Sequence, residues 1–375
     1  MKTAPPRQLG LGVIGCGGFG LFALQHFAQI PGVNLVGMAG THREAAIAAA
    51  RRFGLPDPME TAELLRMPAL DIVYIATPPF LHHPVAMQAL HAGKHVLVEK
   101  PMAMQLSQAD EMLAVAREHG LLMATNLMQR YNPMFDAIRG LLERKPLGEL
   151  LHAYFENYAS DEGLPAEHWF WDRGKSGGIF IEHGVHFFDL FAGWLGTGKV
   201  DAAQVSRRPG TSIEDQVQCT VRYRDDVLVN FYHGFTQPSR MDRQEMRLVF
   251  ERGDVRLEEW VPVRATIHAV VDEADTRTLC ELFPGTRLDV TAWYGGKDRA
   301  CRGRHKALDI YQMVELAYGL PDNKMHRYGE LLRSLFADQL AWIEDRRHVR
   351  KITDENGRDA LAVAVAADEL AHRRS

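Results

Sequence analysis

Hydrophobic residues in the first third of the chain fall into short blocks separated by longer amphipathic stretches. Apolar runs begin at residues 9, 33, 70, 95 and 121. Stretches with helical spacing of apolar residues lie between them, at 21–30, 43–54, 80–93 and 107–120. Strands that are apolar throughout and alternate with helices form parallel sheets covered on both faces. The pattern therefore predicts an α/β fold with a doubly wound parallel sheet.

After about residue 126 the pattern changes to the alternation of half-exposed strands. Segments of this kind, with turn residues between them, lie at 150–160, 215–223, 227–235, 246–260 and 262–271. Two amphipathic segments near the end, 329–348 and 357–375, predict helices. The sequence thus predicts two domains, residues 1–125 and 126–375. The second contains an antiparallel sheet, and its last helix can pack back on the first domain.

Composition narrows the class of protein. The chain has 375 residues and a net charge of −5 without a long basic run, so nucleic acid is not an expected partner. No apolar run has the length of a membrane span, and the first ten residues lack the apolar core of a signal peptide. The four cysteines show no C-x-x-C spacing, which argues against a zinc site or a disulfide framework. We expect a cytoplasmic protein with reduced thiols.

A glycine cluster follows the first predicted strand. Gly15, Gly17 and Gly20 have G-x-G-x-x-G spacing between a strand and a helix. The first glycine permits a tight turn, the second lets a pyrophosphate approach the backbone, and the third lets the helix pack closely on the strand. The motif predicts a dinucleotide-binding site, although a glycine turn without a ligand is the alternative.

The end of the second predicted strand bears on the choice of dinucleotide. NAD-binding units usually carry an acidic residue there, which binds the ribose hydroxyls. Here Gly40 occupies that place and is followed by Thr41, His42 and Arg43. These residues favour NADP over NAD, because no carboxylate follows the strand to repel a 2′-phosphate. The alternative is that Arg43 merely begins a solvated helix.

Three segments together resemble a known family. They are "ATPPFLHH" at 76–83, "VEKPM" at 98–102, and the pair "QRYNPMF" at 129–135 and "SGGIFIEHGVHFFD" at 176–189. In this order, after a G-x-G-x-x-G unit, they resemble the Gfo/Idh/MocA oxidoreductases. The resemblance implies an N-terminal Rossmann domain and a C-terminal α/β domain with a large, open, mostly antiparallel sheet. It also implies homodimers or homotetramers formed through that sheet.

The resemblance assigns roles to individual residues. Lys100, whose bond to Pro101 is often cis in relatives, would lie beside the nicotinamide and the substrate hydroxyl. His186 would take the proton from that hydroxyl, since an ordinary histidine pKa near 6.5 suits transfer in either direction. Glu182 would orient the imidazole or hold a neighbouring hydroxyl, because i, i+4 spacing on a helix places both side chains on one face.

Further contacts follow from the same motifs. The candidates for cofactor binding are Gly15, Cys16, Gly17, Gly18, Phe19, Gly20, Thr41, His42, Arg43, Ala76, Thr77, Pro78, His82, Glu99, Lys100 and Arg130. The candidates for substrate binding are Lys100, Tyr158, Trp171, Arg173, Glu182 and His186. Trp169 and Trp171 could stack on a sugar but could equally belong to the core.

Residues 180–189 have two alternative roles besides proton transfer. A metal site would use Glu182, His183 and His186, but H-x-x-H lacks the spacing of H-E-x-x-H and no cysteine is near. A buried helix with satisfied histidines is the other reading, and it is preferred for His183 only. No metal is therefore expected.

The predicted function is that of an NAD(P)-dependent oxidoreductase acting on a secondary hydroxyl or ketone of a sugar, cyclitol or glycoside. Two alternatives stay open: a redox-neutral glycosidase or lyase that oxidises its substrate transiently, and a dinucleotide-sensing protein without catalysis. The basic segment 295–306 could bind a substrate phosphate, although a solvated loop is more common.

Overall fold

The structure is a computed structural model that describes residues 8–40 and 43–373. Its contacts divide the chain into two compact units. Unit 1 comprises Met1–Tyr131, Glu167–Asp189 and Gly329–Val365, and unit 2 comprises Asn132–Ala166, Leu190–Tyr328 and Ala366–Ser375. The sequence pattern suggested one boundary near residue 125. The contacts instead add two later segments of the chain to the N-terminal unit.

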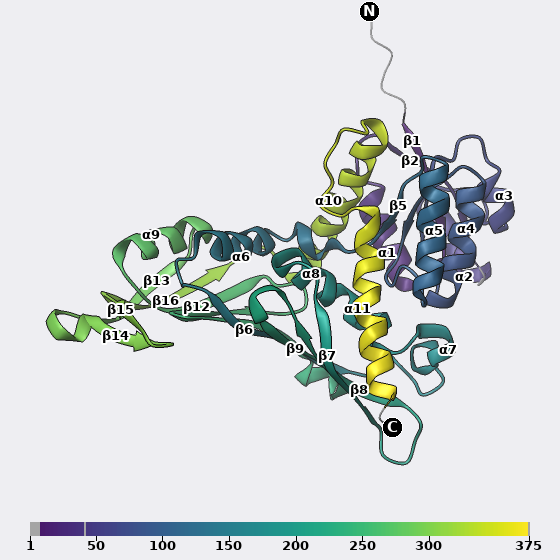
Figure 1. Ribbon diagram of the computed structural model, residues 1–375. Helices are drawn as coiled ribbons and strands as arrows, with labels where there is room; N and C mark the ends of the chain where they lie inside the picture. The colour runs from purple at the N-terminus through teal and green to yellow at the C-terminus, as the bar shows by residue number, and fades with distance from the viewer. Residues whose placement is uncertain (1–7, 41–42, 374–375) are drawn as a thin grey trace, which may run out of the picture. The chain divides into compact units, whose positions relative to one another are not determined.

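Unit 1 is built on a parallel sheet, drawn in purple and blue in Figure 1. Its strands are β1 (Leu9–Ile14), β2 (Val33–Ala39), β3 (Ile72–Ile75), β4 (His95–Val98) and β5 (Met123–Thr125). Their order in the sheet is β2-β1-β3-β4-β5. All four pairings are parallel, as the apolar blocks predicted. The carboxyl ends of these strands therefore share one edge, where open α/β sheets bind their ligands.

Helices connect the strands of unit 1. They are α1 (Gly18–Phe27), α2 (Arg43–Arg52), α3 (Thr61–Leu65), η1 (Pro79–Leu81), α4 (His82–His91), α5 (Leu106–Glu118) and η2 (Met128–Tyr131). The segment 167–189 adds η3 (Trp169–Trp171), α7 (Arg173–Ser176), the π-helix η4 (Phe180–Gly184) and the start of α8 (Val185–Leu195). α1 turns Ala23, Leu24 and Phe27 into the core, where the Phe27 and Tyr74 rings meet edge to face.

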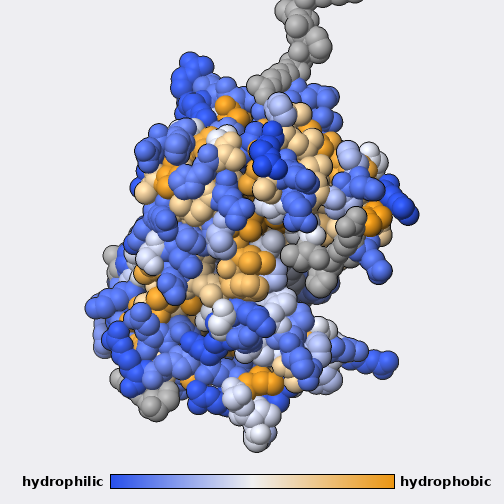
Figure 2. All heavy atoms as spheres, turned by 90° about the vertical axis from the view of Figure 1, so that its right-hand side faces the viewer, coloured by the Kyte–Doolittle hydropathy of each residue, from blue (hydrophilic) through white to orange (hydrophobic). Residues whose placement is uncertain are grey.

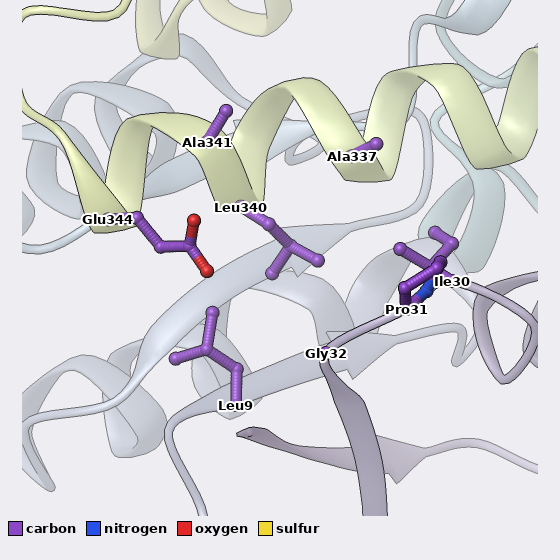
Figure 3. Close-up of a pocket in the computed structure, with 8 residues that line it drawn as sticks. All are labelled: Leu9, Ile30, Pro31, Gly32, Ala337, Leu340, Ala341 and Glu344. Carbon is purple, nitrogen blue, oxygen red and sulfur yellow. The ribbon is translucent and has the colours of Figure 1, made fainter. Parts of the chain in front are cut away.

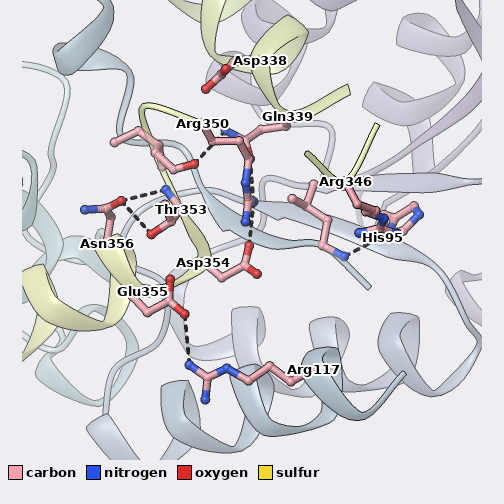
Figure 4. Close-up of polar contacts among 12 residues, drawn as sticks. His95, Arg117, Asp338, Gln339, Arg346, Arg350, Thr353, Asp354, Glu355 and Asn356 are labelled. Atoms are coloured by element: carbon pink, nitrogen blue, oxygen red, sulfur yellow. Dashed lines mark hydrogen bonds and ion pairs between the residues drawn. The ribbon is translucent and has the colours of Figure 1, made fainter. Parts of the chain in front are cut away.

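The C-terminal helices contribute to unit 1 through α10 (Lys324–Glu344) and α11 (Asp354–His372). The part of α10 in unit 1 brings Phe336 against Phe27, with ring centroids 4.4 Å apart. At the start of α11, Glu355 accepts from Arg117 of α5 at 3.1 Å (Figure 4). Arg358 donates to Asp110 of the same helix at 2.9 Å. Residues more than 200 positions apart thus complete the N-terminal sheet unit.

Unit 2 contains a nine-stranded sheet with the order β13-β16-β12-β11-β10-β6-β9-β8-β7. Its strands are β6 (Leu150–Ser160), β7 (Lys199–Arg207), β8 (Glu214–Arg222), β9 (Leu228–Gln237), β10 (Arg243–Phe250), β11 (Gly253–Glu258), β12 (Arg264–Val271), β13 (Arg287–Trp293) and β16 (Gln312–Gly319). Only the β6–β9 pair is parallel among these described strands. The expected large, mostly antiparallel sheet is confirmed.

The sequence pattern did not predict the remaining elements of unit 2. They are α6 (Pro133–Arg144), α9 (Glu273–Leu282), the turns η5 (Arg224–Asp226), η6 (Ser239–Met241) and η7 (Gly296–Arg299), and the hairpin β14 (Ala300–Gly303) with β15 (Lys306–Asp309). The strands β7, β13 and β16 were also not predicted. In the edge strands β7 and β13, exposed residues blur the alternation. Hydrophilic side chains cover most of the face drawn in Figure 2. None of the described helices is long and apolar enough to cross a membrane.

Candidate active site

A large cavity opens at the carboxyl ends of β1 to β4 in unit 1. Its volume of about 1410 Å³ exceeds the range of roughly 300–1,000 Å³ that is usual for small-molecule sites. The predicted residues that line it are Gly15, Cys16, Gly17, Gly18, Phe19, Gly20, Ala76, Thr77, Pro78, Glu99, Lys100 and Glu182. The cavity therefore has room for a dinucleotide and a second molecule. We call the wall near Gly40 its β2 end and the wall near Lys100 its β4 end.

Unit 1 has a second hollow, of about 150 Å³, between the start of β1 and α10. Leu9, Ile30 and Pro31 face Ala337, Leu340 and Ala341 there, with Glu344 at one side (Figure 3). Glu344 is the one titratable side chain among the residues that line it. This hollow offers no pair of groups for acid–base chemistry, so the large cavity is the candidate active site.

The glycine loop has the shape that a pyrophosphate requires. Gly15 has φ +107°, and a Cβ there would lie 2.5 Å from the carbonyl oxygen of Ala76. A Cβ on Gly20 would lie 2.8 Å from the carbonyl oxygen of Gly15. At Gly17, by contrast, no described atom lies within 4 Å of the Cβ position. Gly17 also precedes α1, whose first N–H groups point towards this space and favour an anion. The loop therefore fits a dinucleotide.

The β2 end differs from what the sequence predicted. Thr41 and His42 lie outside the described residues, as does the side chain of Arg43. Two carboxylates nevertheless line this end. Glu60 directly precedes α3, and Glu63 belongs to its first turn. A parallel bridge between Ala39 and Met59 lays that segment beside the end of β2.

The sequence predicted no carboxylate at this end, because none occurs at residues 40–43, directly after the second strand. The structure corrects this point, since a later crossover supplies two. Cys16 lies at the same end, where its thiol is 3.5 Å from the carbonyl oxygen of Ala39 and burial raises its pKa to about 11. This thiol is not a nucleophile at neutral pH.

Lys100 and Glu182 meet at the β4 end. The Nζ of Lys100 donates to Oε1 of Glu182 at 2.5 Å and to its backbone carbonyl at 3.0 Å. Both side chains are largely buried, with 19% and 11% exposure, which strengthens the attraction between the charges. An ammonium group has three donors, so one N–H remains for an oxygen of a bound molecule. The Lys100–Pro101 bond is cis.

His186 is not among the residues that line the cavity, but it lies close enough to Lys100 to feel the charge of that lysine. The imidazole is only 6% exposed, and burial, with a further contribution from the Lys100 charge, holds its pKa well below 6.5. His186 is therefore neutral at neutral pH. The sequence had predicted an ordinary histidine pKa near 6.5, so the lowered pKa is a difference that the structure introduces. The local backbone also differs, because Phe180–Gly184 form a π-helix rather than an α-helix. Such turns are frequent at functional sites.

Glu99 is a buried carboxylate at the β4 end. Its Oε1 accepts from the hydroxyl of Tyr74 and, at 2.6 Å, from Nδ2 of Asn126. Its Oε2 is 3.3 Å from the backbone nitrogen of Lys100. Burial raises the pKa of Glu99 above its usual range. The three contacts fix the strand end that carries Lys100.

Two predicted cofactor ligands are engaged elsewhere. His82 is fully buried, and its ring nitrogens lie 2.7 Å from the carbonyl oxygen of Pro101 and 2.8 Å from that of Thr77. Arg130 forms a bidentate pair with Asp189, at 2.6 and 2.9 Å. Neither His82 nor Arg130 is among the residues that line the cavity. Both make contacts within unit 1, and their contact with a cofactor stays a prediction.

The predicted substrate residues are distributed unevenly. Trp171 and Arg173 are not among the lining residues, whereas His168 and Trp169 are. Tyr158 belongs to unit 2, where its hydroxyl donates to Glu156 at 3.0 Å and its ring lies under the guanidinium of Arg243.

Two other sequence features are also located. The basic segment 295–306 forms η7 and part of the β14–β15 hairpin of unit 2. There Arg299 pairs with Asp309, and Lys306 with Glu251. Within residues 8–40 and 43–373, no group of three or more His, Cys, Asp or Glu side chains is arranged to hold a metal ion. The ring of His183 packs on Phe187, with centroids 5.6 Å apart.

Comparison with known proteins places the chain in a family. The profile of the oxidoreductase family with an NAD-binding Rossmann fold, GFO_IDH_MocA, matches residues 9–127, and that of the GFO/IDH/MocA C-terminal domain matches 135–256. The chain is 32% identical to a 1,5-anhydro-D-fructose reductase of Ensifer adhaerens, over 55% of this chain and 63% of that protein. It is 27% identical to a scyllo-inositol 2-dehydrogenase (NAD(+)) of Bacillus subtilis, over 51% of this chain and 55% of that protein.

Solved structures share the whole fold at low sequence identity. A levoglucosan dehydrogenase in complex with NADH and L-sorbose aligns with a TM-score of 0.75 and 19% identity, over 98% of both chains. A 3-ketoreductase from Actinomadura kijaniata in complex with NADP and TDP-benzene aligns with a TM-score of 0.74 and 19% identity, over 97% of this chain and 98% of that chain. The two profiles and the geometry of the glycine loop agree, and the chain belongs to the Gfo/Idh/MocA oxidoreductase family.

Proposed function

We propose that this protein is an NAD(P)-dependent oxidoreductase that interconverts a secondary hydroxyl and a ketone on a sugar, cyclitol or glycoside. The observation that carries the proposal is the Lys100–Glu182 pair, which lies in the same cavity as the glycine loop. The curated relatives support the substrate class, since their names include an anhydrofructose reductase and an inositol dehydrogenase.

The chain would hold the cofactor along the strand ends. Gly15, Gly17 and Gly20 shape the pyrophosphate site, and the volume of the cavity leaves space for a sugar-sized molecule at the β4 end. The nicotinamide supplies hydride transfer. The protein's own contribution is to orient the substrate carbon and to manage the proton on its oxygen.

Lys100 is the group best placed to hold that oxygen. Glu182 occupies two of its three N–H donors and fixes the ammonium, so the third donor is directed to a ligand. An ammonium stabilises an oxygen on which negative charge develops, and it does so more strongly in a water-poor site.

His186 is the second proton-handling group in the proposal. Because its imidazole is neutral, it can accept the proton of a substrate hydroxyl, and it returns that proton in the reverse direction. Its lowered pKa makes the imidazolium a strong acid, which favours the return step. A sensor of dinucleotides would not need this arrangement of lysine, glutamate and histidine.

The choice between NAD and NADP depends on opposed features. The residues that favour NADP, Thr41, His42 and Arg43, follow the second strand in the sequence. Glu60 and Glu63 favour NAD, because carboxylates hydrogen-bond to ribose hydroxyls and repel a 2′-phosphate. Steady-state rates with both dinucleotides measure the preference directly.

The test mixes the purified chain with NAD or NADP and a panel of sugars, cyclitols and glycosides, and follows both reduced nicotinamide and substrate. Reduced nicotinamide accumulating with one compound supports the proposal and names the substrate class. Substrate loss without net reduction supports a redox-neutral glycosidase or lyase instead. Dinucleotide binding with no turnover in either direction, with ketoses and inosose-type ketones included, contradicts an enzymatic role.

Self-association through the large sheet is also part of the proposal. The strands of this sheet alternate between buried and more exposed side chains, as in β12, where Ile267 is buried and His268 is exposed. One face of the sheet in unit 2 is thus available to a second copy. Light scattering of the purified chain tests for a homodimer or homotetramer. The proposed location is the cytoplasm.

A further inference from the structure

The segment His168–Trp169 forms a wall of the cavity that the proposed mechanism does not use. Both residues line the cavity together with Lys100 and Glu182. The neighbouring helix α7 packs against η1, which follows β3. The segment therefore belongs to the side of the cavity where β3 and β4 end, rather than to the β2 end.

The backbone of this segment is fixed at several points. Phe170 is buried and packs edge to face on Trp171, with ring centroids 4.8 Å apart. Asp172 accepts from the backbone nitrogen of Gly174 at 2.9 Å and so caps α7. His168 caps η3 in the same way. These contacts order the backbone of the segment and hold the His168 side chain at the start of η3.

The cap defines which nitrogen of His168 carries a proton. Its Nδ1 accepts from the backbone nitrogen of Phe170 at 3.2 Å. A neutral imidazole with an accepting Nδ1 carries its hydrogen on Nε2. No described residue accepts a hydrogen bond from that Nε2, so His168 presents a donor to the cavity wall.

Trp169 supplies an apolar surface next to this donor. The two rings lie with centroids 5.1 Å apart and planes inclined by 36°. The indole is only partly buried. A sugar or cyclitol ring matches this combination, because one face of the ring presents C–H groups while its edge carries oxygen atoms. An indole face gains contact area with such C–H groups.

We propose that His168 and Trp169 form a binding subsite for the ring of a sugar or cyclitol substrate. The ring stacks on the indole of Trp169, and one of its oxygen atoms accepts from Nε2 of His168. The inference rests on the proposed function, and it deepens that function by naming two residues that select a ring-shaped polyol over an open-chain compound.

The first test compares Trp169→Ala with Trp293→Ala, an exposed indole of unit 2 that is not among the lining residues. With a cyclic substrate, we expect KM to rise about tenfold in Trp169→Ala, a loss typical of one stacked aromatic contact. The kcat should stay within about threefold, and the Kd of the dinucleotide should not change. Trp293→Ala should leave KM within about twofold. Thermal melting of both variants controls for folding.

The second test uses two replacements of His168. In His168→Gln the amide nitrogen can take the place of Nε2, so KM should stay within about twofold of the wild type. In His168→Asn the amide can still cap η3 but cannot reach the ligand, and KM should rise roughly three- to tenfold. Nitrogen-15 NMR of labelled histidine should show an N–H at Nε2 and none at Nδ1.

Each outcome decides between the inference and its alternatives. An active wild type with unchanged KM in Trp169→Ala and His168→Asn overturns the subsite but leaves the proposed function standing. Equal losses in dinucleotide and substrate affinity also overturn it, because the two residues would then bind the cofactor. A wild type that turns over no compound of the panel overturns the proposed function itself.

Discussion

The two ends of the cavity are built differently. At the β2 end, Glu60 and Glu63 are exposed side chains on one short segment. At the β4 end, Lys100, Glu182 and His186 are largely buried, and the lysine and glutamate are 82 positions apart in the sequence. Water screens the exposed charges at the first end more strongly than the largely buried charges at the second. Recognition of a polar ribose can occur in water, whereas proton transfer at fixed atoms needs a buried and rigid arrangement.

The largest effect is expected from removing the lysine of the β4 end. In Lys100→Ala the substrate oxygen loses its charged donor, so we expect kcat to fall by about 10²–10⁴-fold. Dinucleotide affinity should change by less than about threefold, because the glycine loop is untouched. His186→Ala should show the same pattern of retained dinucleotide binding and lost turnover. Stopped-flow turnover and nicotinamide fluorescence titration measure the two quantities, and full activity in His186→Ala would contradict its assignment.

The buried ion pair beside the site should dominate stability. Arg130→Met leaves Asp189, which is 1% exposed, without its partner, and we expect a loss of about 3–5 kcal/mol in the free energy of unfolding. Burial raises the pKa of Asp189 to about 6, so its carboxylate is still mostly ionised at neutral pH. Urea unfolding at neutral pH measures the loss.

A matched surface pair provides the control for this variant. Arg117 and Glu355 are 61% and 51% exposed, so Arg117→Met should cost less than about 1 kcal/mol. Similar losses in Arg117→Met and Arg130→Met would mean that burial does not set the difference. Adding Asp189→Asn to Arg130→Met should recover part of the lost stability, since it removes the unpaired charge.

The pH dependence of oxidation tests the state of His186. A base must be neutral to accept a proton, and the pKa of His186 lies well below 6.5 because burial and the Lys100 charge disfavour the imidazolium. In the direction of hydroxyl oxidation, kcat/KM should therefore stay level as the pH falls through 6.5 and decline only at lower pH. A decline centred at or above pH 6.5 would show that His186 is not the group that titrates.

The smallest effect is expected at the exposed β2 end. Neutralising Glu60 and Glu63 together, as Glu60→Gln with Glu63→Gln, should raise the ratio of kcat/KM for NADP over NAD by roughly fivefold, because exposed charges interact by about 1 kcal/mol. Glu44→Gln is the control, since Glu44 is exposed but does not line the cavity. The same ratio in all three proteins would remove these carboxylates from cofactor selection.

Patterns confined to neighbouring residues were predicted well. The apolar blocks gave the five parallel strands, and the spacing of Gly15, Gly17 and Gly20 gave the turn before α1. A lysine directly after an apolar strand had to lie at the ligand-binding edge of the sheet, as Lys100 does. Each of these features depends on residues within a few positions of one another, so the sequence contains all that is needed.

Features that depend on packing were not predictable in the same way. Trp169 and Trp171 are equally apolar. The direction in which η3 turns each side chain decides that Trp169 lines the cavity and Trp171 does not. Arg130 had the charge of a cofactor ligand, but a carboxylate 59 positions later occupies its guanidinium. The π-helix before His186 was not predicted, because the residue pattern of Phe180–Gly184 is also that of a regular α-helix.

The sequence by itself determined the family and the parallel sheet, and it placed Lys100 at the ligand-binding edge of that sheet. Only the tertiary structure decided that Glu182 pairs with Lys100, that His186 is neutral and that Glu60 and Glu63 come to the β2 end. The physical reason is that strand and turn formation follow from local sterics and apolar spacing. Charge pairing and pKa values instead depend on distance and burial in space, which residues far apart in the sequence create together.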